Sequence, residues 1–169
     1  MTTQVTTALI ADAAITQAKM GPNVAGNGPA FSAYQSTLQA VANNTSTKIQ
    51  LQTESFDPNA NFDSTTNYRF TPTVAGYYQL NFSVGFTVTP GSVSSIDLLF
   101  YFNGAQIKIF RQYLPTGAAN PMIAASQLVY FNGFTDYAEV YVSHAFGASA
   151  NTTAANDRTY FQGALVRAA

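Results

Sequence analysis

The sequence predicts an all-β protein, a ten-strand antiparallel jelly-roll β-sandwich preceded by a short extended arm. Three observations indicate this class. Apolar and polar residues alternate with period two from residue 77 to residue 88, as in a strand with one buried face. Turn signals rich in Asn, Gly, Pro and Asp recur between segments of this kind. The 13 Phe and 10 Tyr residues are enough to fill a core between two sheets.

The composition changes near residue 28. Residues 1–20 are rich in Ala and Thr and contain no aromatic residue, whereas aromatic residues recur every few positions from Phe31 onward. Between them, residues 21–29 read GPNVAGNGP, a run of turn formers that continues neither a helix nor a strand. We therefore expect an attachment arm over residues 1–28 and a jelly-roll domain over residues 29–169.

The arm contains a ten-residue repeat. The segment VTTALI at residues 5–10 aligns with ITQAKM at residues 15–20, with apolar residues at the first, fourth and sixth positions of each copy. Two copies are too few to bury an apolar face by stacking on each other. The arm is therefore predicted to dock on another protein through four apolar side chains, namely Val5, Ile10, Ile15 and Met20.

The segment 77–88 places one row of apolar residues in the predicted core, namely Tyr78, Leu80, Phe82, Val84, Phe86 and Val88. Ile49 with Leu51, and Val140 with Val142, show the same alternation in shorter strands. Asn103-Gly104 lies between two apolar runs and predicts a two-residue type I′ hairpin. These strands and turns are typical of a sandwich or a jelly roll.

Some predicted strands are apolar on both faces. Residues 96–102 read IDLLFYF and residues 128–131 read LVYF, while residues 107–110 are similar apart from Lys108. Only one face of a strand meets the core of a sandwich, so a neighbouring subunit is expected to cover the other. The low content of charged residues, 9% against about 25% in an average domain, agrees with a largely covered exterior. The interface candidates are Leu99, Tyr101, Val129 and Phe131. If the opposite faces of these strands point outward, the candidates are instead their alternate-parity neighbours, the adjacent residues along each strand.

The segment from Phe70 to Phe82, FTPTVAGYYQLNF, resembles the signature of C1q-like globular heads, in which a Phe, five residues and a Gly precede alternating aromatics. Leu80 stands where this family usually has Phe. Residues 29–33, PAFSA, resemble the first strand of the family, and residues 160–166, YFQGALV, resemble its last strand. The resemblance implies a ten-strand jelly roll that assembles as a homotrimer. Gly76 would permit a positive φ or a close approach at the start of the long strand.

The arm resembles segments found in virion proteins of bacteriophages, and the collagen stalk of animal C1q-like proteins is absent. The resemblance implies a trimeric knob on the exterior of a phage virion. We expect a capsid decoration or cement protein whose arm binds another virion protein, the major capsid protein. The alternative is a tail-fibre or spike tip that binds a glycan or protein receptor on the host. The short arm favours the capsid location. Its 28 residues reach at most about 90–100 Å when extended, whereas a tail fibre made of one chain would usually need a longer shaft.

Catalytic chemistry has little support in the sequence. His144 is the only histidine, and its neighbour Ser143 would point to the opposite face of a strand, so the two cannot form a catalytic pair. Asp57 and Asp63 could share a Ca²⁺, but solvated loop carboxylates are the favoured interpretation. We expect no enzymatic activity, no cofactor and no metal. A net charge of −1 disfavours nucleic acid as a partner, and no apolar run is long enough for membrane insertion.

Overall fold

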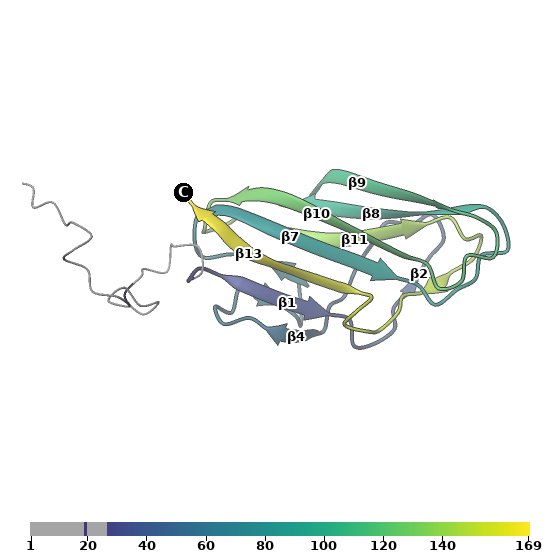
Figure 1. Ribbon diagram of the computed structural model, residues 1–169, viewed down its shortest axis with the longest axis horizontal. Coiled ribbons are helices and arrows are strands. Elements are labelled where there is room, and N and C mark those ends of the chain that lie inside the picture. The colour runs from purple at the N-terminus through teal and green to yellow at the C-terminus, as the bar shows by residue number, and fades with distance from the viewer. Residues whose placement is uncertain (1–18, 20–26) are drawn as a thin grey trace, which may run out of the picture.

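The computed structural model describes Lys19 and residues 27–169, which form two antiparallel sheets packed face to face (Figure 1). The first, called the β7 sheet, has the order β10-β7-β13-β1-β4. Its strands are β10 (Met122–Phe131), β7 (Gly76–Gly85), β13 (Tyr160–Ala168), β1 (Ala30–Tyr34) and β4 (Thr53–Phe56).

The second sheet, called the β8 sheet, has the order β5-β6-β11-β8-β9. Its strands are β5 (Phe62–Asp63), β6 (Arg69–Phe70), β11 (Ala138–His144), β8 (Ser94–Phe102) and β9 (Ala105–Leu114). Each of these two orders contains five strands, and together they make up the predicted ten-strand jelly roll. The short β3 (Thr47–Lys48) also pairs with β11, and β2 (Ala40–Val41) pairs with β12 (Ala150–Asn151).

The core lies between the two sheets and is filled largely by aromatic rings. Phe82 of β7 stacks on Phe100 of β8 with ring centroids 5.4 Å apart. Phe31 of β1 stacks on Phe70 of β6 at 4.1 Å. The predicted apolar row of the long strand is confirmed from Tyr78 to Phe86, whose side chains at alternate positions are fully buried. Val88, the last residue of the predicted row, lies beyond the end of β7 and is only partly buried.

Two predicted backbone features are also confirmed. Asn103 and Gly104 have φ values of 52° and 77°, the two positive angles that a type I′ hairpin between β8 and β9 requires. Gly76 allows a close approach of two strands, since a Cβ there would lie 2.4 Å from the carbonyl oxygen of Arg167. The end of the last strand, β13, therefore lies against the start of β7 without a side chain between them.

The start and the C-terminus of the described domain lie at the same end of the sandwich. The N–H of Leu165 donates to the carbonyl oxygen of Pro29, and the N–H of Ala169 donates to that of Ala75. The start of β1 and the C-terminus therefore lie at the same end of the sandwich (Figure 1). The predicted docking residues of the arm, Val5, Ile10, Ile15 and Met20, lie outside the described residues.

Candidate functional site

The outer face of the β7 sheet is unusually apolar. Because Tyr78, Leu80 and Phe82 point inward, the residues between them point away from the core. Six large hydrophobic side chains on this face are 42% to 53% exposed, and they are Phe56, Tyr77, Met122, Leu128, Tyr130 and Val166. Tyr77 and Tyr130 face each other across β7 and β10, with ring centroids 5.4 Å apart. Several exposed large hydrophobic side chains on one face of a sheet mark an interaction surface.

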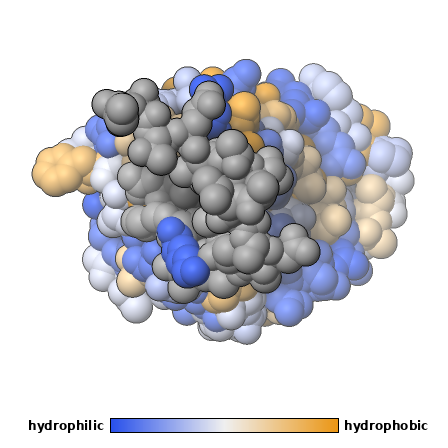
Figure 2. Space-filling model, turned by 60° about the vertical axis from the view of Figure 1, so that its left-hand side comes forward, coloured by the Kyte–Doolittle hydropathy of each residue, from blue (hydrophilic) through white to orange (hydrophobic). Residues whose placement is uncertain are grey.

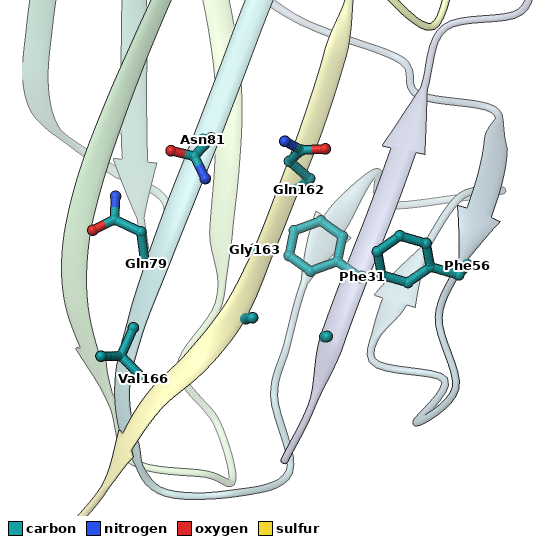
Figure 3. Close-up of a pocket in the computed structure, with 9 residues that line it drawn as sticks. Phe31, Phe56, Gln79, Asn81, Gln162, Gly163 and Val166 are labelled. Carbon is teal, nitrogen blue, oxygen red and sulfur yellow. The ribbon is translucent and has the colours of Figure 1, made fainter. Parts of the chain in front are cut away.

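A shallow hollow of about 320 Å³ lies on the same face, over β1, β7 and β13 (Figure 3). Phe56 and Val166 stand at its margins, and the carboxamides of Gln79, Asn81 and Gln162 lie across it. Gly163 lies at its floor, and a Cβ at this position would point into the core, 2.4 Å from a methyl carbon of Leu80. The face thus combines an apolar border with a strip of amide groups that can donate and accept hydrogen bonds.

The outer face of the β8 sheet is largely covered by its own side chains. Leu99 points outward but is only 3% exposed, since it lies in register between Ile109 and Tyr141. Tyr101 stacks on Tyr141 with ring centroids 4.0 Å apart. The buried carboxylate of Glu139 forms an ion pair with Lys48, which also lies over the Tyr141 ring.

The edge strand β9 is the exception on the β8 sheet. Ile107, Ile109 and Tyr113 are all exposed there, and Tyr113 is exposed to 73%. An exposed apolar edge strand without a partner invites association with another chain. One protein chain therefore carries two distinct apolar surfaces, the outer face of the β7 sheet and the β9 edge.

The predicted interface residues fall into two groups. Leu99 and Tyr101 lie on the outer face of the β8 sheet, beside the β9 edge. Val129 and Phe131 instead pack in the core of their own chain, which corrects their assignment as interface residues. Their alternate-parity neighbours, Leu128 and Tyr130, point outward on β10. The sequence left this parity open because residues 128–131 are apolar on both faces.

His144 has a structural role. Its buried ring donates from Nε2 to the carbonyl oxygen of Val41 at 3.0 Å and accepts at Nδ1 from the N–H of Phe146 at 3.4 Å. Burial lowers the pKa of His144, so the neutral ring is favoured. Both ring nitrogens are occupied by the backbone, and neither is free to act as a general base.

Asp57 and Asp63 serve two separate turns. Asp63 accepts hydrogen bonds from the N–H groups of Thr65, Thr66 and Asn67, and these bonds hold the pKa of its carboxyl well below the usual range. Asp57 accepts from the N–H of Phe62 at 2.6 Å, while burial raises its pKa. Among the residues that the structure describes, no three His, Cys, Asp or Glu side chains cluster as metal ligands would.

Several solved structures share this jelly roll. Murine APRIL aligns over 82% of this chain and 98% of its own, with a TM-score of 0.58 and 12% identity. The globular domain of zebrafish complement 1qA aligns over 83% and 99%, with a TM-score of 0.55 and 14% identity. Eiger TNF from S. frugiperda aligns over 83% and 93%, with a TM-score of 0.55 and 8% identity. The domain therefore has the TNF/C1q-like jelly-roll fold.

No family model and no curated protein matches the chain. In the part of the chain that the structure describes, no helix is long and apolar enough to cross a membrane. The likeness to TNF and C1q domains rests on structure, and at 8% to 14% identity it defines the fold alone.

Proposed function

We propose that this protein is a non-enzymatic structural protein of a phage virion, a homotrimeric knob anchored to the particle by its N-terminal arm. The observation that carries the proposal is the outer face of the β7 sheet, with six half-exposed large hydrophobic side chains on a domain of which only 9% is charged. A monomer would leave this face in water at a considerable free-energy cost.

Trimerisation follows if the two apolar surfaces meet. A face and an edge are different surfaces, so a contact between them is heterologous, and each copy uses its edge on one neighbour and its face on the other. Such contacts either close into a ring or run on as a filament. Three copies are the closed ring that the resemblance to C1q-like heads implies. Interfaces of this obligate kind bury about 2,000 Å² or more.

The virion assignment is supported by the resemblance of the arm to phage virion proteins. Burial of its four apolar side chains would contribute up to about 1.5–3 kcal/mol each. Ordering the backbone opposes this by about 1–2 kcal/mol for each fixed residue. A single arm therefore gains little net affinity, whereas three arms on one trimer bind with avidity. A threefold site on a shell of major capsid protein could bind all three arms at once. We therefore favour capsid decoration over a fibre or spike tip.

Electron microscopy of virions labelled through this protein tests the proposal. We expect threefold knobs on the capsid exterior, with density for the arm reaching the shell. Label at the distal end of a tail fibre or spike would establish the receptor-binding alternative instead. Absence of label from every part of the particle would overturn the virion assignment.

A further inference from the structure

The loop between β10 and β11 displays an aromatic ring to solvent. Phe134 is 85% exposed, more than any other large hydrophobic side chain in the described part of the chain. Isolated exposed hydrophobic residues are common on protein surfaces. The structure around Phe134 is what distinguishes it, because the loop beneath the ring is extensively hydrogen-bonded.

The backbone of this loop is held by two side chains. Asn132 Oδ1 accepts hydrogen bonds from the N–H groups of Phe134, Thr135 and Asp136, at 2.8, 2.9 and 3.1 Å. Asp136 in turn accepts from the N–H of Asn132 at 2.8 Å and from the amide of Asn103 at 2.9 Å. The loop is therefore tied both to itself and to the β8–β9 hairpin. A partner that binds Phe134 has little backbone entropy to remove.

The loop also lies at the end of the domain where β1 begins and the C-terminus lies. Gly133, with a φ of 74°, packs so closely on the loop before β7 that a Cβ there would lie 2.3 Å from the nitrogen of Ala75. The carbonyl oxygen of Ala75 in turn accepts a hydrogen bond from the N–H of Ala169, which directly follows β13. Leu165 of the same strand binds Pro29 through its N–H. Figure 2 turns this end toward the viewer, and there hydrophobic groups stand among hydrophilic ones, with one group projecting from the outline.

The chemistry of the tip selects the kind of partner. Its side-chain oxygen acceptors are occupied, since Asn132 and Asp136 bind the loop and the Asn132 amide donates to the Thr135 hydroxyl at 2.8 Å. Recognition of a glycan needs free polar groups that fix its hydroxyls, and this tip offers mainly a ring. An aromatic ring on a rigid support instead suits an apolar pocket of a folded protein, as at the centre of protein interfaces.

We propose that Phe134 inserts into an apolar pocket of the same virion protein that receives the arm. This inference rests on the proposed function, in which that protein faces the arm end of the knob. Each trimer would then present three rings beside three arms. The rings would fix the orientation of the knob, while the arms supply reach.

The test is cosedimentation of full-length protein with particles that lack it. We expect Phe134→Ala to weaken binding by about tenfold or more, as for a buried aromatic anchor. Phe134→Trp should bind within a few-fold of the parent, because it keeps a ring. The matched control is Val93→Ala, since Val93 is 73% exposed and precedes β8 at the opposite end of the domain. The control should bind as the parent does.

Melting temperature and trimer mass, measured on each variant, separate contact from folding, and neither should change for Phe134→Ala. Equal binding by the parent and Phe134→Ala would overturn this inference and leave the proposed function standing. If the parent itself fails to bind particles, the attachment role falls and this inference falls with it. Loss of binding by Val93→Ala to the same extent would also contradict a specific role for Phe134.

Discussion

Phe82 is the residue on which the two sheets depend most clearly. Its ring stacks on Phe100 at 5.4 Å and meets Phe110 and Phe161 edge-on, at 5.8 and 6.1 Å. We predict that Phe82→Ala lowers the free energy of unfolding by about 3–5 kcal/mol, because it removes these contacts and leaves a cavity. Urea denaturation followed by circular dichroism measures the change. Phe134→Ala, at an exposed Phe, is the matched control and should alter stability by less than about 0.5 kcal/mol. Equal midpoints for Phe82→Ala and the parent would refute the core assignment.

The burial of His144 predicts that the stability of the fold depends on pH. Its pKa in the folded protein is below its ordinary value of about 6.5, so the unfolded chain takes up the proton first as the pH falls. The neutral ring therefore contributes full stability above about pH 7, and this contribution declines as the pH falls below about 6.5. We predict a steeper fall in melting temperature between pH 7 and 5 for the parent than for His144→Phe. Parallel curves would show that protonation of His144 does not destabilise the fold.

At the scale of elements, the arm and the sandwich are predicted to be separable. We expect a chain without residues 1–24 to remain folded and trimeric, because the predicted interface lies wholly within the domain. The truncated knob should fail to bind particles that lack the native protein, since Phe134 alone is a small contact. Light scattering and cosedimentation measure the two properties. Continued binding would assign attachment to the jelly roll, and loss of the trimer would make the arm an assembly element.

The strands differ in how much of their environment the sequence reveals. The alternation along β7 predicts its buried row correctly, and Asn103-Gly104 predicts its hairpin, because each signal is local. On β10 the residues 128–131 are apolar at every position, so periodicity cannot say which face is buried. Pairing with β7 settles it, since Val129 lies opposite the inward Tyr78. Strands of two residues, such as β5 and β6, are too short to carry any periodic signal.

The candidate site was predictable only in outline. Apolar residues on both faces of a strand indicated a covered surface, but not which sheet carried it. The hollow is lined by Gln79 of β7 and by Gln162 and Gly163 of β13, and these two segments are far apart in sequence and meet only through the pairing of β7 with β13. Phe134 was missed, although the Asn132-Gly133 turn signal before it marks a loop that fixes its own backbone.

At the scale of the whole molecule, the distribution of apolar surface is what demands partners. The described domain keeps its charges few and exposes large hydrophobic groups on the β7 sheet, along β9 and at the arm end. The proposed closed ring of copies would cover the first two surfaces. The third lies apart from them, and we propose that a different protein covers it. A monomer leaves all three in water.

The mass of the full-length protein in solution tests this account most directly. We predict that light scattering at micromolar concentration gives three times the 18.1 kDa of one chain. Leu128→Glu, on strand β10 of the apolar face, should dissociate the trimer, because the interface would bury an unpaired carboxylate. Phe134→Glu places the same charge at an exposed site apart from both apolar surfaces and should leave the mass unchanged. A stable monomer for the parent chain, or a trimer that survives Leu128→Glu unaltered, would contradict assembly through the β7 sheet.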